Sequence, residues 1–294
     1  MPASPDKSVR RTSLLVEQEL AKSDNSISQV VEIFREAALA AGAYIFEQSK
    51  AQASLKFKED GSIVSNVDVL AELLVRERLS GTLPSYPFVG EESAAALTSD
   101  LLNSQILIMV DTLDGTREFV SGSPEYTVNI GLVAAGEPVC GVVFAPALGE
   151  MFWGSTTDGA YKAVVRGKSI MQIRKIVTRP HKTPVIFTSK SRGDSPAVRQ
   201  FIDTFSQARV ERLGSSLKFC RLAEGLGDFY PCFGDTYEWD TTAGHAILNA
   251  AGGKVIGLDN EPLRYGKAEP LSARLFLNPN FIATADSDYV LGHL

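Results

Sequence analysis

An apolar run that ends in two carboxylates constrains this chain more than any other feature of its sequence. Residues 106–110, Ile-Leu-Ile-Met-Val, are typical of a buried strand, and Asp111-Thr-Leu-Asp114-Gly-Thr116 follows directly. Carboxylates at the end of a buried strand are costly unless a cation neutralises them, and oxygen ligands so close together suit Mg²⁺ better than Zn²⁺ or copper. Gly115 permits close backbone approach, and the amides of Gly115 and Thr116 are free to face a phosphate. The segment therefore predicts metal-assisted phosphoryl chemistry.

Two further acidic elements support this interpretation. Upstream, Phe88-Val-Gly-Glu91-Glu92-Ser93 again places carboxylates directly after a hydrophobic stretch. Downstream, Trp239-Asp240 precedes residues 241–251, which are predicted to form a helix with Asp240 as its N-cap and Gly252-Gly253 as its stop. An isolated Asp before a helix is more often only a cap, and the combination of the three elements is what favours a metal site.

Together, these motifs resemble the inositol monophosphatase superfamily of Mg²⁺-dependent, Li⁺-sensitive phosphatases. The Gly-Glu-Glu, Asp-Pro-hydrophobic-Asp-Gly-Thr and Trp-Asp-x-Ala-Ala-Gly elements of that superfamily are matched at residues 90–92, 111–116 and 239–244, with Thr112 in place of the Pro. Within the superfamily the chain looks most like the CysQ group of 3'(2'),5'-bisphosphate nucleotidases. The segments that carry this closer resemblance are 117–119, 125–130, 141–146, 214–220 and 276–279.

The resemblance implies a mixed α/β (α+β) fold, a layered αβαβα sandwich of the inositol monophosphatase/fructose-1,6-bisphosphatase type. The predicted organisation is a polar extension over residues 1–26, a metal-binding α+β sub-domain over 27–150 and a substrate-binding α/β sub-domain over 151–294. From the residue patterns, helices are predicted over 28–47, 67–79, 196–206, 216–224 and 241–251. Strands are predicted over 105–111, 126–135, 139–145, 184–189 and 229–231, with a turn at Ala135-Gly136.

The resemblance also implies which residues hold two or three Mg²⁺ ions. Glu91 and the Leu113 carbonyl would bind the first ion, Asp114 and Asp240 the second, and Asp111 would contact both. A third, weaker ion would lie near Glu91, and Glu91 is also predicted to be a catalytic residue.

The attacking water is predicted to be oriented by Asp68 and Thr116. Ile63-Val-Ser65-Asn-Val-Asp68 matches a Val-Thr-x-x-Asp element of the superfamily, with Ser in place of Thr. The alternative is that Asp68 only caps the helix predicted over 67–79, where the helix dipole favours a carboxylate.

Substrate binding is predicted for six residues: Gly115, Thr116, Arg192, Ser215, Lys218 and Asp240. Ser215-Ser-Leu-Lys218 matches a Ser-x-x-Lys element that contacts the nucleotide in the nucleotidase group, although Lys218 could also be an ordinary helix lysine. The Tyr-Pro-Arg-Phe element of the family reads Tyr-Pro-Cys232-Phe, and its Ser-Arg-Ser-His element reads Ser-Lys-Ser-Arg192. Arg192 is therefore predicted to substitute in part for the missing Arg.

Composition excludes several other classes of protein. The 294 residues carry a net charge of −6, so no basic field predicts binding to a nucleic acid polymer. No run of 18 apolar residues is present that could span a membrane, and no apolar signal-peptide core follows the polar start. The three cysteines are scattered, which fits a reducing cytoplasm; peripheral attachment to the inner membrane is implied by the resemblance alone.

Three functional hypotheses follow. The first is a Mg²⁺-dependent phosphatase that uses a metal-activated water to remove the 3'-phosphate of adenosine 3',5'-bisphosphate, giving AMP. The second is a monophosphatase for inositol phosphate or another sugar phosphate, and the third is a regulatory, partner-binding protein with this fold. Each of the first two takes a small phosphate ester as its partner, and neither a Ser-His-Asp triad nor a Gly-x-x-x-x-Gly-Lys-Ser/Thr loop is recognisable. The oligomeric state is not determined by the sequence.

Overall fold

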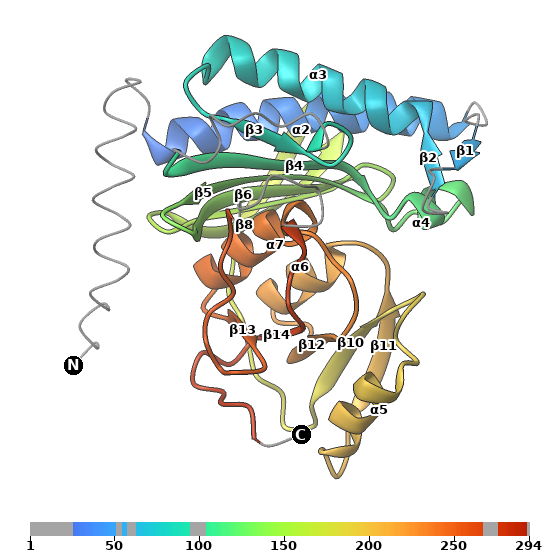
Figure 1. Ribbon diagram of the computed structural model, residues 1–294, viewed down its shortest axis with the longest axis vertical. Coiled ribbons are helices and arrows are strands. Elements are labelled where there is room, and N and C mark those ends of the chain that lie inside the picture. The colour runs from blue at the N-terminus through green and yellow to red at the C-terminus, as the bar shows by residue number, and fades with distance from the viewer. Residues whose placement is uncertain (1–25, 51–54, 58–62, 95–103, 267–275, 293–294) are drawn as a thin grey trace.

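The computed structural model describes residues 26–50, 55–57, 63–94, 104–266 and 276–292, and in them helical layers alternate with sheets (Figure 1). Helices α2 (Ile27–Lys50) and α3 (Asn66–Thr82) cover one face of a seven-stranded sheet. Helices α6 (Leu217–Ala223) and α7 (Glu238–Ala250) lie between it and a five-stranded sheet, with α5 (Pro196–Asp203) beyond. This αβαβα order confirms the predicted mixed α/β fold. Apart from residue 26, the predicted extension lies outside the described residues.

The larger sheet has the strand order β3-β4-β5-β6-β7-β8-β9, and the smaller sheet has the order β11-β10-β12-β14-β13. All pairs in the larger sheet are antiparallel except β3 with β4. The bounds of the strands and of the short helix α4 are β1 Leu55–Phe57, β2 Ile63–Ser65, β3 Phe88–Gly90, β4 Ile106–Asp114, α4 Thr116–Val120, β5 Thr127–Ala134, β6 Glu137–Ala145, β7 Glu150–Ser155, β8 Gly159–Arg166, β9 Ser169–Ile176, β10 Val185–Ser189, β11 Arg209–Leu213, β12 Phe229–Cys232, β13 Lys254–Gly257 and β14 Phe281–Thr284.

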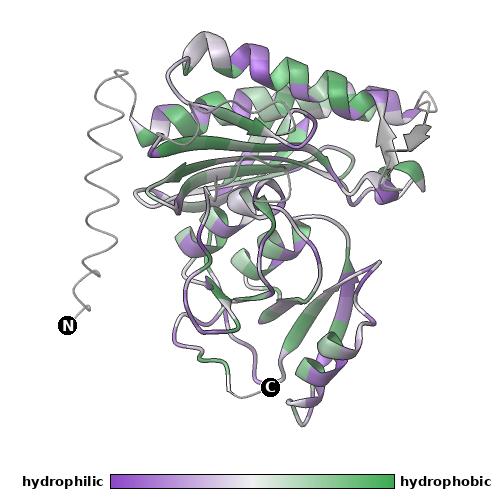
Figure 2. Ribbon diagram, viewed as in Figure 1, coloured by the Kyte–Doolittle hydropathy of each residue, from purple (hydrophilic) through white to green (hydrophobic). Residues whose placement is uncertain are grey.

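The core of the larger sheet follows from its apolar central strands. Strands β4, β5 and β6 are buried along almost their whole length and are mostly hydrophobic (Figure 2). Such strands need cover on both faces. Ala135 and Gly136 connect β5 to β6, and both have positive φ angles, 50° and 78°. A two-residue hairpin of this kind matches the twist of its strands, so the predicted turn is confirmed.

The larger sheet extends further along the chain than the sequence pattern indicates. Strands β7, β8 and β9 continue it from Glu150 to Ile176, and the chain enters the smaller sheet only at Val185. The predicted second sub-domain begins at residue 151, whereas the change of sheet follows Ile176. Strand β9 is mostly exposed, so it lacks the apolar alternation by which a half-buried strand is recognised.

A row of three glycines brings α7 close to the larger sheet. Gly131 on β5 pairs with Gly141 on β6, which pairs with Gly154 on β7. A Cβ atom at Gly141 would lie 2.6 Å from the Cα of Ala243 on α7. The helix backbone therefore rests in a groove that any side chain in this row would fill. The close approach places the first turn of α7 beside the carboxylates of β4.

Candidate active site

A cleft of about 640 Å³ opens where the two sheets and the helices between them meet. Ten of the residues predicted to bind metal or substrate line it: Glu91, Asp111, Leu113, Asp114, Gly115, Thr116, Arg192, Ser215, Lys218 and Asp240. Asp68 does not line the cleft, but its carboxylate lies close enough to act on Asp111. Segments separated by about half the chain thus converge on one cavity.

Three carboxylates form the centre of the cleft. Ligand oxygens of Glu91, Asp111 and Asp240 all lie within 4.8 Å of one another. Burial and the neighbouring carboxylates, with Glu91 and Asp114 the strongest, raise the pKa of Asp111 well above its usual range. Ionising all of these carboxylates together is therefore costly, and a hard divalent cation would offset that cost. The donor set therefore fits Mg²⁺, as the resemblance implies.

An irregularity in β4 explains how two carboxylates of one strand reach the same site. Asp111 pairs with Asn129 and Asp114 with Thr127, so β4 has one residue more than β5 between these pairs. Bulges of this kind redirect side chains. The backbone N–H of Leu113 donates to Asp111 Oδ1 at 2.9 Å, and this hydrogen bond within the bulge holds the Asp111 side chain in place. Strand alternation alone would place Asp111 and Asp114 on opposite faces.

Gly115 and Thr116 form the turn from β4 into α4. Gly115 has a left-handed backbone, with φ 91° and ψ 42°, a conformation that favours glycine. The Thr116 hydroxyl donates to the Leu113 carbonyl at 3.2 Å. This carbonyl is the one predicted to bind the first Mg²⁺. The pairing of Thr116 with Asp68 around a water molecule stays a prediction.

Asp240 is a residue of the first turn of α7, and the prediction that it is the N-cap is wrong. The helix begins at Glu238, its N-cap is Tyr237, and Asp240 Oδ2 accepts the backbone N–H of Tyr237 at 2.8 Å. The helix therefore begins three residues before the predicted start at 241, and the rings of Tyr237 and Trp239 stack there with their centres 4.8 Å apart. Burial, followed by the charges of Asp114 and Glu91, raises the pKa of Asp240 well above its usual range.

Asn129 and Ser216 connect the acidic residues, and the sequence motifs did not reveal their role. Asn129 Nδ2 donates to Ser216 Oγ at 3.0 Å and to Asp114 Oδ2 at 3.4 Å. Ser216 Oγ in turn donates to the Asp240 carbonyl at 2.6 Å. This chain of contacts links β4, β5, the start of α6 and α7. The available signals were the segments 125–130 and 214–220, which resemble the nucleotidase group but carry no individual role there.

Lys218 lines the cleft, but its ammonium group is already occupied. Lys218 Nζ donates to the carbonyls of Ser215 at 2.6 Å and Leu213 at 3.3 Å, and it lies 4.9 Å from the centre of the Tyr230 ring. Burial lowers the pKa of Lys218, and nearby carboxylates, Asp114 foremost, oppose this effect. Ser215 has a φ of 48°, so Lys218 holds a left-handed turn at the cleft wall. Its contact with substrate stays a prediction.

Arg192 is more accessible than Lys218. Its side chain is exposed, and Nη1 donates to the Asp235 carbonyl. Its positive charge lowers the pKa values of Cys232 and Asp240, against the larger effect of burial. Arg192 therefore lies close enough to Cys232 for its charge to act on the thiol, and its substitution for a missing Arg stays a prediction.

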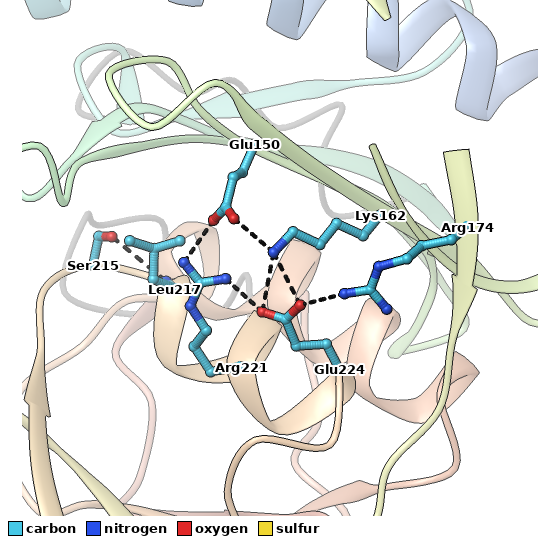
Figure 3. Close-up of polar contacts among 7 residues, drawn as sticks. All are labelled: Glu150, Lys162, Arg174, Ser215, Leu217, Arg221 and Glu224. Atoms are coloured by element: carbon cyan, nitrogen blue, oxygen red, sulfur yellow. Dashed lines mark hydrogen bonds and ion pairs between the residues drawn. The ribbon is translucent and has the colours of Figure 1, made fainter. Parts of the chain in front are cut away.

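A cluster of ion pairs attaches α6 to the larger sheet (Figure 3). Glu224, at the end of α6, contacts Lys162 at 3.0 Å, Arg174 at 2.8 Å and Arg221 at 2.5 Å. Glu150 contacts Lys162 and Arg221, both at 2.6 Å. The cluster therefore fixes one end of α6 while the other end presents Ser215 and Lys218 to the cleft.

Comparison with known proteins agrees with this geometry. The 3'(2'),5'-bisphosphate nucleotidase CysQ of Escherichia coli K12 is 36% identical over 225 residues, 76% of this chain and 86% of that protein. Its counterpart from Buchnera aphidicola is 34% identical over 232 residues, 79% of this chain and 84% of that protein.

Solved structures show the same relationship. CysQ from Bacteroides thetaiotaomicron, described as a bacterial member of the inositol monophosphatase family, superposes with a TM-score of 0.71 at 29% identity, covering 90% of this chain and 99% of that one. An inositol monophosphatase from Anabaena gives 0.67 at 26% identity, covering 90% and 93%. Among the described helices, none is long and apolar enough to cross a membrane. The inositol monophosphatase family model matches residues 26–288, and the chain belongs to this family of phosphatases.

Proposed function

We propose that the protein is a Mg²⁺-dependent 3'(2'),5'-bisphosphate nucleotidase that converts adenosine 3',5'-bisphosphate to AMP and phosphate. The observation that carries the proposal is the group of Glu91, Asp111 and Asp240 at the centre of the cleft, with Arg192 and Lys218 on its wall. The names of the CysQ relatives support the choice of substrate. Placement in the cytoplasm rests on the sequence, and the three cysteines are free and buried.

In this proposal Glu91, Asp111, the Leu113 carbonyl, Asp114 and Asp240 hold two or three Mg²⁺ ions. Bound Mg²⁺ supplies charge neutralisation, an activated water and stabilisation of the leaving oxygen. No nucleophilic side chain is required.

The remaining residues of the cleft orient the reactants. Asp68 and Thr116 hold the attacking water in line with the ester bond. The amides of Gly115 and Thr116 donate to the phosphoryl oxygens, because the left-handed turn at Gly115 leaves no side chain in their way. Arg192 binds the second phosphate, which a monophosphate substrate lacks.

Comparison of two substrates tests the proposal and its main alternative, an inositol or sugar monophosphatase. We expect wild type to have a higher kcat/KM for adenosine 3',5'-bisphosphate than for inositol 1-phosphate. Arg192→Ala should lower kcat/KM about 10- to 100-fold for the bisphosphate and leave it unchanged for inositol 1-phosphate, because an Arg–phosphate contact contributes about 1.5–3 kcal/mol. Lys218→Ala tests whether Lys218 also binds the nucleotide or only holds the Ser215 turn. If it only holds the turn, kcat/KM should fall equally for both substrates.

Arg166→Ala changes an exposed arginine that does not line the cleft. This matched control should leave kcat/KM unchanged for both substrates. A wild-type preference for inositol 1-phosphate would establish the alternative. No hydrolysis of any phosphate ester with Mg²⁺ present would favour a regulatory protein, against which the assembled carboxylates argue.

A further inference from the structure

The carboxylate of Glu72 lies against the turn that carries Glu91. Glu72 is on α3, one helical turn after Asp68, and its side chain is 5% exposed. Glu72 Oε2 accepts the backbone N–H of Glu92 at 2.8 Å. A Cβ atom at Gly90 would lie 2.4 Å from the same oxygen. Glu72 therefore contacts the backbone on both sides of Glu91 without being the residue that points into the cleft.

Arg76, a further turn along α3, secures the ends of the same segment. Arg76 Nη2 donates to Ser93 Oγ at 2.5 Å, and the guanidinium lies 4.6 Å from the centre of the Phe88 ring. Arg76 Nη2 also lies 4.0 Å from Glu72 Oε1, so the buried carboxylate has a cation nearby. Helix α3 thus contacts residues 88–93 at three points: the Phe88 ring, the Glu92 backbone N–H and the Ser93 hydroxyl.

We propose that Glu72 is a positioning residue that sets the backbone of residues 90–93 so that the Glu91 carboxylate meets the metal. The proposal rests on the metal site of the proposed function. The group of carboxylates within 4.8 Å of one another contains Glu91 but not Glu72, so Glu72 acts through the turn. A charge-assisted bond to a backbone N–H holds this geometry more firmly than a neutral acceptor would. Loss of such an outer partner typically weakens metal binding about 10- to 100-fold.

Calorimetric titration of the full chain with Mg²⁺, without substrate, tests the role of Glu72. We expect Glu72→Ala to raise the dissociation constant for Mg²⁺ about 10-fold or more. Glu72→Gln should raise the dissociation constant by only about 3-fold, because the amide oxygen still accepts the Glu92 N–H. Val75→Ala truncates a fully buried side chain of the same helix and should leave Mg²⁺ affinity unchanged despite a lower melting temperature.

Gly90→Ala supplies an independent test through a double-mutant cycle. In the wild-type background the added methyl group meets the Glu72 carboxylate and should weaken Mg²⁺ binding about 10-fold. In the Glu72→Ala background the methyl group has room, so it should add less than about 3-fold. If Glu72→Ala does not fold, the comparison of Glu72→Gln with Gly90→Ala carries the same test.

Wild-type Mg²⁺ affinity in Glu72→Ala, or additive effects in the cycle, would overturn the positioning role. Mg²⁺ binding that depends on Glu72 in a protein inactive on every phosphate ester would support this role and reject the proposed function. Absence of Mg²⁺ binding by wild type would reject the metal site on which both depend.

Discussion

Asp111 is the residue on which the charges of the cleft converge. It is 3% exposed and faces the carboxylates of Glu91, Asp114, Asp240 and Asp68. Without a cation this arrangement destabilises the folded chain, because like charges repel strongly where little water screens them. We expect the same arrangement to give the cleft its affinity for a divalent cation.

Asp111→Asn should therefore separate activity from stability. We expect phosphate release in saturating Mg²⁺ to fall on the order of 100-fold or more, since even outer partners of a metal account for 10- to 100-fold. In excess EDTA the variant should resist urea at least as well as wild type, because one buried charge is gone. Asp203→Asn, at an exposed position on α5, should match wild type in both assays. Undiminished hydrolysis by Asp111→Asn would remove Asp111 from the metal site.

At the scale of elements, the glycine row decides how closely α7 approaches the larger sheet. Gly141→Ala should destabilise the protein by about 1–3 kcal/mol, because its methyl group would overlap the backbone of α7 at Ala243. Gly81→Ala, on α3 with no atom near the new methyl group, should be neutral or stabilising by up to about 1 kcal/mol. Urea unfolding measures both. Equal stability of the two variants would mean that α7 can shift without cost.

The ion-pair cluster is the second connection between elements. Glu224 is 2% exposed, and Glu224→Gln would leave three cations around a neutral amide. Lys162 and Arg221 keep Glu150 as a partner, so we expect a loss of about 1.5–3 kcal/mol from the weakened charge-assisted bonds to Glu224. Arg174→Gln should cost less than about 1 kcal/mol, since Arg174 is 56% exposed. Similar unfolding free energies for the two variants would show that α6 is held by apolar packing instead.

At the scale of the whole molecule, the acidic cleft should make metal-free stability depend on pH. Burial and neighbouring carboxylates raise the pKa values of Asp111 and Asp240, so the folded chain keeps protons that the unfolded chain has released. The contribution of these retained protons to the free energy of unfolding is complete below the pKa of the unfolded chain's carboxyls, about 3.9. It is lost as pH rises through the higher folded values.

Urea unfolding in EDTA should accordingly show a contribution from these two residues that decreases as pH rises above about 4. Mg²⁺ should reverse this trend near neutral pH, because the proposed site exists, with its carboxylates ionised, in the folded chain only. The difference between Asp111→Asn and wild type, measured across the same pH range, isolates the effect from other titrating groups. A difference that does not vary with pH would contradict the linkage.

The sequence was sufficient for features whose causes are local. The helices predicted over 28–47 and 67–79 are present in α2 and α3, because their apolar spacing already defines a buried face. The Ala135-Gly136 turn and the buried strand before Asp111 likewise depend on neighbouring residues only. The ordered motifs identified the family, and with it the αβαβα fold.

Tertiary structure alone decided what depends on distant partners. The exposed strands β9 and β11 carry little hydrophobic pattern and exist because neighbouring strands pair with them. Residues 242 and 243 of α7 pack against Gly131 and Gly141 of the larger sheet, a contact between segments about 100 residues apart that no local cap signal contains. Glu72 reaches a backbone N–H twenty residues away, a contact that no motif contains. Local residues determine which elements form, and the folded chain determines which of their polar groups meet.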